Sequence, residues 1–310
     1  MDIYEAKQIK PMLIGESAEP FDSTEYIYEL KLDGERCIAY LDPEEGTELR
    51  NKRNVKMIPK FPELADMHHQ VSKRCILDGE LIVTVDGQPE FFEVQRRSLM
   101  SNKFKIDLQS KQYPASYVAF DILYVDGENL TTRPLLERKH ILDSTVKEGG
   151  RLAISRYIEE KGTDLYNLTV DKGLEGVVAK DKVSKYYFDK RTKDWIKIKN
   201  LQDDDFVVCG YILKDKGVTS IVLGQYGDDG LQYKGHVTLG VSGGSFRKIR
   251  ELPRISSPAF DAPVGNENAV WVEPVLVCSV KYMEKMQSGA LRQPVFKGLR
   301  DDKLPGECRE

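Results

Sequence analysis

Residues 28–36 have the sequence YELKLDGER, in which an apolar strand is expected to end at Lys31. A tight Asp-Gly turn follows at residues 33–34 and Arg36 lies beyond it, so residues 26–42 are predicted to form a hairpin. A nucleophilic lysine must lose its proton before it reacts, and cationic neighbours or partial burial favour that loss. The stretch fits a reactive lysine facing a phosphate-sized space, and it also fits an ordinary Asp-Gly hairpin with exposed charges.

Three further stretches supply charges of the kind that bind phosphates and metals. They are ILDGEL at residues 76–81, LEGVVAK at residues 174–180 and WIKIK at residues 195–199. The first presents Glu80 after a second Asp-Gly turn, and the second presents Glu175 before a strand. The third puts Lys197 and Lys199 on one face of a strand, because side chains alternate along it. Lysines alone on such a strand would indicate a solvated strand edge. Together with the two carboxylates, they predict a phosphate clamp beside a metal site.

Length and composition restrict the class of protein. A chain of 310 residues with 40% hydrophobic and 31% charged residues is expected to form about two folded domains. No apolar run approaches the roughly 20 residues of a membrane span, and the N-terminus lacks a secretory signal. The five cysteines form no CxxC pair, which argues against a disulfide framework or a zinc ribbon and favours the reducing cytoplasm. Four histidines without ligand spacing are not expected to bind a metal: His68, His69, His140 and His236.

The net charge of −4 argues against a surface that binds nucleic acid throughout. Local segments differ from that average. Residues 185–199 hold six Lys or Arg against two Asp, and a second basic segment contains Arg96, Arg97, Lys103 and Lys105. Such segments can follow phosphates even on an acidic protein, without recognising a base sequence.

Taken in order, the motifs KxDGxR, DGE, FD, EGVVAK and WxKxK resemble those of covalent nucleotidyltransferases, specifically the ATP-dependent DNA ligases. The string FKGLRDDK at residues 296–303 resembles the last motif of that family, in the form typical of DNA ligases. The resemblance covers nearly the whole chain and is strongest to the ligase domains of bacterial end-joining enzymes. It implies an α+β fold, with a nucleotidyltransferase (ATP-grasp-like) catalytic domain of antiparallel sheets at residues 1–200 and an OB-fold β-barrel at residues 201–310.

Alternation and helical periodicity predict the elements of each domain. In the first, strands are expected at residues 75–77, 81–85 and 117–124, and helices at 134–145 and 163–170. In the second, strands are expected at 206–213, 220–226, 231–239 and 270–282, with a helix at 244–251, which suits a small barrel such as an OB-fold. The acidic run at 203–205 is expected to be a solvated hinge between the domains.

The resemblance implies roles for the residues around a nucleotide. Lys31 would attack the α-phosphorus of ATP, form a lysyl-AMP phosphoramidate and expel pyrophosphate. Glu29 would contact the adenine amino group, and Phe120 would stack on the base. Arg36 and Glu80 would lie around the ribose and the α-phosphate.

The resemblance also implies a metal site and a phosphate clamp. Glu80 and Glu175 are the expected ligands of Mg²⁺, with Mn²⁺ able to substitute, because oxygen ligands suit these ions. Lys197 and Lys199 would neutralise the α-phosphate as charge moves during transfer. The same cations would favour the neutral amine of Lys31.

Two further groups of residues are expected to act at other steps. Arg53 resembles the arginine that senses the 5′-phosphate of a nick, although Lys52 replaces the usual serine of that motif and Arg50 is an alternative sensor. In the second domain, three residues are expected to close over ATP in the first step and to move away before DNA binds: Arg300, Asp302 and Lys303.

The implied function is an ATP-dependent DNA ligase, which uses ATP as AMP donor and joins a 5′-phosphate to a 3′-hydroxyl. The expected partner is nicked double-stranded DNA, bound without sequence specificity by a monomer in the cytoplasm, on the nucleoid if the source is bacterial. Double-strand ends as a second substrate and a Ku-like end-binding partner stay open. So do three alternatives: an RNA ligase, an mRNA-capping guanylyltransferase and, from another class, a non-catalytic nucleic-acid-binding module.

Overall fold

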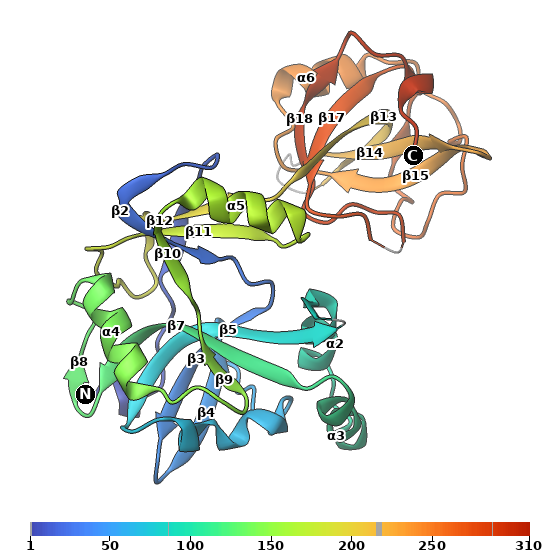
Figure 1. Ribbon diagram of the computed structural model, residues 1–310. Coiled ribbons are helices and arrows are strands. Elements are labelled where there is room, and N and C mark those ends of the chain that lie inside the picture. Colours follow the sequence, from blue (N-terminus) through green and yellow to red (C-terminus); the bar gives the residue numbers. More distant parts are fainter. Residues whose placement is uncertain (1, 86, 215–218, 287) are drawn as a thin grey trace. The chain divides into compact units, whose positions relative to one another are not determined.

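Figure 1 presents a computed structural model of the chain, which describes residues 2–85, 87–214, 219–286 and 288–310. The chain divides into two compact units, Met1–Asn200 and Leu201–Glu310, each with its own hydrophobic core. Within the described ranges, no helix is long and apolar enough to cross a membrane.

A five-stranded sheet of the first unit separates apolar from charged side chains. Its strand order is β1 (Leu13–Ser17), β12 (Arg191–Lys199), β11 (Gly176–Asp181), β2 (Ser23–Leu30) and β10 (Tyr157–Glu160). Only β1 and β12 among these neighbours run parallel. Helix α5 (Gly162–Asp171) packs on β2 and β11, as Figure 1 shows, where Ile196 and Ile198 join a buried cluster. Because side chains alternate, Lys197 and Lys199 face away from that cluster.

A seven-stranded sheet forms the other layer of the first unit. The main order is β4 (Gly46–Asn51), β3 (Glu35–Asp42), β5 (Cys75–Val85), β7 (Ala115–Val125) and β8 (Glu128–Asn129). The short strand β6 (Gln88–Pro89) pairs with β5, and β9 (Leu152–Ile154) pairs with β7 in parallel. One face packs on the 3-10 helix η1 (Pro62–Gln70), and the other shares a buried cluster with the five-stranded sheet through Ile38, Val178 and Trp195. The two sheets therefore pack against each other.

Among its described residues, the first unit also contains the α-helices α1 (Ile3–Ala6), α2 (Phe91–Ser98), α3 (Lys103–Gln112) and α4 (Leu135–Thr145). Helix α4 packs against β7. The predictions of a buried strand at 117–124 and of helices at 134–145 and 163–170 are confirmed by β7, α4 and α5.

The predicted hairpin at residues 26–42 is wrong. Strand β2 pairs with β10 and β11, whereas β3 pairs with β4 and β5, so the two strands belong to different sheets. Residues 31–34 carry the chain from one sheet to the other. An Asp-Gly pair signals a change of direction, but it does not determine which strands occupy the edges on either side.

The predicted turn at Asp78 and Gly79 is also wrong, because β5 continues through both as one strand of 11 residues. A Cβ atom on Gly79 would lie 2.5 Å from the carbonyl oxygen of Val118 and 2.6 Å from the ring of Tyr117. The glycine therefore permits close packing against β7, at a place where the register of the two strands shifts.

The second unit is a small barrel with the strand order β15 (Gly230–Val237), β14 (Thr219–Gly227), β13 (Gln202–Leu213), β17 (Val277–Tyr282) and β18 (Val295–Arg300). Strand β16 (Val270–Trp271) pairs with β13, and α6 (Gly243–Arg250) and the 3-10 helix η3 (Pro305–Glu307) complete it. A bridge between Leu239 and Val295 joins the end beyond β15 to β18, which closes the barrel. The predicted OB-fold is confirmed, although the predicted strand at 270–282 is two strands and β18 was not predicted.

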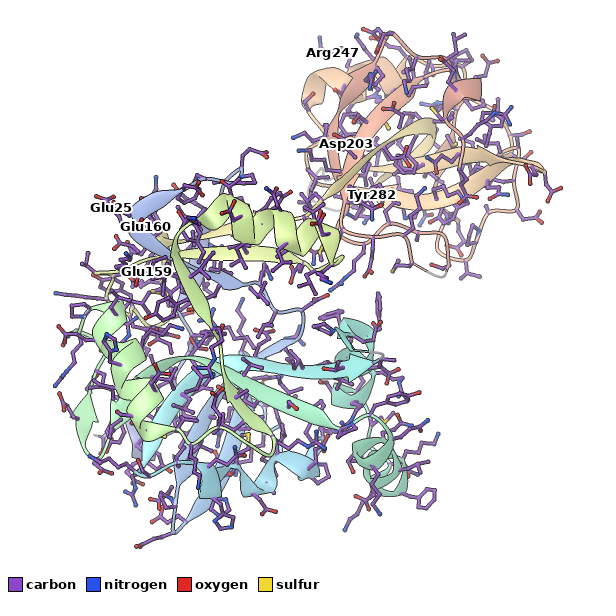
Figure 2. The ribbon with its side chains drawn as sticks, viewed as in Figure 1. Glu25, Glu159, Glu160, Asp203, Arg247 and Tyr282 are labelled. Atoms are coloured by element: carbon purple, nitrogen blue, oxygen red, sulfur yellow. The ribbon has the colours of Figure 1, made fainter. Side chains whose placement is uncertain are left out.

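The predicted hinge at residues 203–205 is wrong, because all three aspartates lie in β13 and pair with β17. Figure 2 labels Asp203 on β13 and Tyr282 on β17. The hydroxyl of Ser279 donates to Asp203 at 2.6 Å, and the amine of Lys285 lies 3.3 Å from Asp204. Partners of this kind offset the repulsion between neighbouring carboxylates, so the acidic run can be part of a sheet.

Candidate active site

Lys31 directly follows β2, at the point where the chain leaves the five-stranded sheet. Its backbone amide donates to the carbonyl of Gly176 at 2.8 Å, which fixes it beside β11. Its Nζ lies 2.7 Å from Oε2 of Glu175, and Nζ of Lys199 lies 3.4 Å from Oε1 of the same carboxylate. The side chain of Lys31 is 21% exposed and that of Glu175 is 4% exposed. One buried carboxylate thus holds two amines, both of them partly exposed.

The predicted pair of lysines lies on the charged face of β12, opposite the buried Ile196 and Ile198. Burial lowers the pKa of Lys199, and Glu175 opposes that shift, while Lys31 and Lys197 add to it. Three lysines therefore share one neighbourhood. Such a group attracts an anion with several negative oxygens, such as a phosphate.

Glu80 reaches the same neighbourhood from the other sheet. It lies opposite Arg36 across β5 and β3. Burial raises the pKa of Glu80 to about 8; Lys31 and Arg36 oppose the shift, and Glu175 and Asp78 add to it. The two predicted metal-binding glutamates are thus close enough to affect each other. Two carboxylates near each other and near lysines are oxygen donors of the type that suits Mg²⁺ or Mn²⁺.

Arg36 is held in place by residues whose role the sequence did not reveal. Its Nε donates to Oδ1 of Asp78 at 3.0 Å, and Nη2 donates to Oδ2 at 2.5 Å. The hydroxyl of Tyr186 donates to the same Oδ2 at 2.6 Å. The guanidinium lies 5.3 Å from the ring centroid of Phe120 and 5.5 Å from that of Trp195. Asp78, interpreted as a turn residue, instead orients Arg36.

The predicted base-binding residues Glu29 and Phe120 are brought together by Lys180. Its Nζ lies 3.1 Å from Oε2 of Glu29 and 4.3 Å from the ring centroids of both Phe120 and Trp195. Burial lowers the pKa of Lys180 to about 8, although Glu29 opposes that shift. The other oxygen of Glu29 forms an ion pair with Lys139 of α4. Neither lysine was predicted, although Lys180 ends the motif that contains Glu175.

The two arginines predicted as candidate sensors of a 5′-phosphate differ in their exposure and in their partners. Arg50 is half-buried and is engaged by the carboxylate of Glu48 and by the carbonyl of Asn54, to which it donates at 3.2 Å. Arg53 is exposed in the turn after β4, and across the described residues its guanidinium has no hydrogen-bond or ion-pair partner. Arg53 is therefore the more accessible of the two guanidinium groups.

The second unit gathers its three predicted residues around Asp205 of β13. Arg300 donates to both oxygens of Asp302, at 2.8 and 2.7 Å, and its Nη1 lies 3.3 Å from Asp205. Nζ of Lys303 lies 2.8 Å from Asp205. The hydrogen bonds from Arg300 lower the pKa of Asp302 to about 2. The motif thus forms one charged cluster, and Asp205 is a member that the sequence did not indicate.

The two basic segments differ in what they expose. Lys185, Lys190, Arg191 and Lys193 are all exposed, as expected for a phosphate-binding surface. In the other segment Arg97 is fully buried and bonded to Glu63 and to two carbonyl oxygens, so it cannot contact DNA. The helical period of α2 turns it inward beside Val94.

One grouping was not expected from the spacing of the histidines. Asp66, His68 and His69 each bring a ligand atom within 4.8 Å of the others on η1. Nδ1 of His68 is 3.2 Å from the hydroxyl of Thr47 and 3.1 Å from the carbonyl oxygen of Ala65, which fix its ring. The 3-10 conformation places residues three apart on one side, and the linear pattern did not show this.

Comparison with known proteins supports one family for the whole chain. Residues 6–199 match the family described as "ATP dependent DNA ligase domain", and residues 214–303 match "ATP dependent DNA ligase C terminal region". A "SPbeta prophage-derived DNA ligase-like protein LigB" of Bacillus subtilis is 30% identical, over 94% of this chain and 99% of that protein.

Longer relatives and solved structures agree. A "Multifunctional non-homologous end joining protein LigD" of Pseudomonas aeruginosa is 33% identical over 90% of this chain, which spans only 34% of that protein. The solved structure "mycobacterial DNA ligase D complexed with ATP and MES" has a TM-score of 0.58 and 26% identity, covering 98% of this chain and 99% of that chain. The chain therefore belongs to the family of ATP-dependent DNA ligases.

Proposed function

We propose that this DNA ligase seals nicks with 5′-phosphate and 3′-hydroxyl ends through a lysyl-AMP formed on Lys31. The main support is the contact between Nζ of Lys31 and buried Glu175, with Lys199 on the other oxygen of that carboxylate. Glu175 fixes the amine in one orientation, and the open side of Lys31 remains accessible to a nucleotide. Positioning of this kind contributes much of the rate in phosphoryl transfer.

In the first step, neutral Nζ of Lys31 attacks the α-phosphorus of ATP. A P–N bond forms, the P–O bond to pyrophosphate breaks, and the amine loses its remaining extra proton. Lys197 and Lys199 neutralise the charge on the α-phosphate, and Arg36, held by Asp78, contacts the same phosphate or the ribose. Phe120 and Glu29 hold the base.

Glu80 and Glu175 would hold a divalent cation, Mg²⁺ with Mn²⁺ able to substitute. Their fit rests on two oxygen donors that lie near each other and near Lys31. When bound, the ion supplies additional positive charge to the phosphates.

In the second step, AMP passes from Lys31 to the 5′-phosphate, so that a P–O–P bond forms and the P–N bond breaks. The 3′-hydroxyl then attacks the 5′-phosphorus and releases AMP. We assign Arg53 to the 5′-phosphate, because its guanidinium is exposed while Arg50 is engaged by Glu48. We further assign the adenylation chemistry to residues 1–200 and a role in the first step to three residues of the barrel at 201–310: Arg300, Asp302 and Lys303.

The partner that we propose is nicked duplex DNA, bound by a monomer in the cytoplasm, or on the nucleoid in a bacterium. The exposed cations of residues 185–193 would contact phosphates, so binding should weaken steeply with salt. Joining of double-strand ends with a Ku-like protein is a further proposal, which a comparison of nicked and broken substrates with and without such a protein would decide.

The proposed function is tested by sealing of nicked DNA with two kinds of 5′ end. With a 5′-phosphate and ATP, Lys31→Ala and Lys31→Arg should both be inactive, since a guanidinium does not lose its proton at neutral pH. With a pre-adenylated nick, Lys31→Ala should still seal, because the third step needs no lysyl-AMP. Sealing of phosphorylated nicks by Lys31→Ala would refute the proposal.

A further inference from the structure

Helix α4 turns two cations toward the interior of the first unit. Its buried residues are Leu135, Arg138, Lys139, Leu142 and Thr145. Their spacing of three and four residues defines one face of a helix. The apolar members pack in the ordinary way, whereas Arg138 and Lys139 bring positive charge into the core. A buried charge is costly without a partner, so the identity of each partner is informative.

The partners of these two cations lie on different sheets. One partner is next to a predicted base-binding residue in the sequence, and the other is itself such a residue. Arg138 donates from Nε and Nη2 to the two oxygens of Asp121, each at 2.8 Å, and Asp121 follows Phe120 on β7. Lys139 forms an ion pair with Oε1 of Glu29 on β2. Helix α4 therefore links the aromatic residue and the carboxylate that would bind the base.

Glu29 is in contact with two ammonium groups, and its two oxygens are not equivalent. Lys180 donates to Oε2 at 3.1 Å. Oε1 lies against Lys139, but neither Oε1 nor Nζ of Lys139 has a hydrogen bond of acceptable geometry within the described part of the chain. Nε1 of Trp195, whose ring lies beside Lys180, is likewise buried without a partner there. A carboxylate oxygen has two acceptor positions, so Oε1, although paired with Lys139, can still accept a hydrogen bond from a ligand.

We propose that Lys139 is a positioning residue, which holds Oε1 of Glu29 toward the exocyclic amino group of adenine and thereby favours ATP over GTP. This inference rests on the proposed function of the site. Adenine has an N–H donor at position 6, which a carboxylate oxygen accepts. Guanine has a carbonyl oxygen there, which a fixed carboxylate repels. Lys180 fixes one oxygen of Glu29, and Lys139 fixes the direction of the other.

The test compares ATP with purine riboside triphosphate, which has only hydrogen at position 6 of the purine, and with GTP, which has a carbonyl at position 6 and an amino group at position 2. Single-turnover formation of lysyl-AMP or its analogue gives kcat/KM for each. Wild-type protein should prefer ATP to purine riboside triphosphate by about 10- to 100-fold, the effect of a hydrogen bond to a charged group. Lys139→Met should lose most of that preference through ATP alone, while purine riboside triphosphate changes by less than about threefold.

Two controls separate positioning from a structural effect. Lys182→Met removes a lysine that pairs with Glu159, labelled on β10 in Figure 2, and should leave the preference unchanged. Glu29→Gln with Lys139→Met should be no worse than Glu29→Gln alone, because Lys139 acts through Glu29. That double variant also leaves no unpaired carboxylate, which protects the fold.

Equal losses with ATP and purine riboside triphosphate in Lys139→Met would overturn the inference, since a general loss of structure does not distinguish position 6. Additive losses in the double variant would overturn it as well. Failure of wild-type protein to form any lysyl-AMP would contradict the proposed function instead, and equilibrium binding of the same three nucleotides would then decide the role of Lys139.

Discussion

Nζ of Lys31 lies 2.7 Å from Oε2 of Glu175, although the two residues are 144 positions apart in the sequence. The contact exists because β2 and β11 are neighbours, and the amide of Lys31 donates to the carbonyl that follows Glu175. The same carboxylate contacts Lys199, at the end of β12. Residues beside three neighbouring strands, β2, β11 and β12, thus converge on one carboxylate.

Replacement of that carboxylate should impair the first step strongly. In Glu175→Gln, Lys31 and Lys199 lose the charge that holds both amines, so lysyl-AMP formation should fall on the order of 100-fold or more. Single-turnover labelling with ATP carrying a labelled α-phosphate measures it. Glu159→Gln, which removes an exposed carboxylate of the same unit, serves as the control. A near-normal rate in Glu175→Gln would show that the contact is not needed for reaction.

Arg53 and Arg50 should differ at the second step. Arg53→Ala should form lysyl-AMP normally but transfer AMP to a 5′-phosphate about 10- to 100-fold more slowly, because a charge-assisted contact to the phosphate is lost. Arg50→Ala, which removes an arginine already engaged by Glu48, should have a smaller effect on transfer. Mixing pre-adenylated protein with nicked DNA measures transfer alone. The opposite ranking would assign the sensor to Arg50.

Burial of Lys180 should make stability depend on pH. Its pKa of about 8 in the folded protein lies below the value of about 10.4 for an unfolded chain. The unfolded chain therefore binds the proton more tightly, and stability should rise as pH increases from about 8 to about 10, with no change from this group below pH 8.

The expected size of that effect is on the order of 2 to 3 kcal/mol. Urea unfolding at pH 7, 8.5 and 10 should show wild-type protein gaining stability relative to Lys180→Met by this amount. Lys182→Met, at a partly exposed lysine, should show no such trend. A constant difference between wild type and Lys180→Met would mean that Lys180 keeps its proton throughout.

Gly79→Ala should destabilise the first unit. The new Cβ would lie 2.5 Å from the carbonyl oxygen of Val118, and backbone cannot move aside as a side chain can. Overpacking of this kind costs about 1 to 3 kcal/mol or more. Gly298→Ala, at a position with no atom within 4 Å, is the matched control. Equal melting temperatures for the two variants would contradict the packing of β5 against β7.

The motif residues could be predicted because each one lies in a short string whose order and chemistry are distinctive. Their convergence could not, since alternation within a strand does not say which strands are neighbours. The Asp-Gly pairs at residues 33–34 and 78–79 look alike in the sequence, yet the first connects two sheets and the second lies inside one strand. Only the pairing of the flanking strands separates the two cases.

The charged residues whose positions were not predicted were missed for a different reason. Helix α4 was predicted from its apolar residues, and that pattern gave no indication that Arg138 and Lys139 would be buried. Their burial depends on acidic partners in two other strands. The prediction for the acidic run at residues 203–205 was wrong for the same reason, because its partners Ser279 and Lys303 lie far along the chain. Charged residues become core residues only where tertiary structure supplies the opposite charge.

The central claim, that Lys31 is the residue that carries AMP, is tested most directly by locating the adduct. The protein is incubated with ATP and Mg²⁺, digested, and analysed by peptide mass spectrometry under conditions that preserve a phosphoramidate. We predict one AMP moiety on the peptide that contains Lys31, removed by hydroxylamine or by pyrophosphate and absent from Lys31→Ala. AMP on another residue, or the same adduct in Lys31→Ala, would contradict the account.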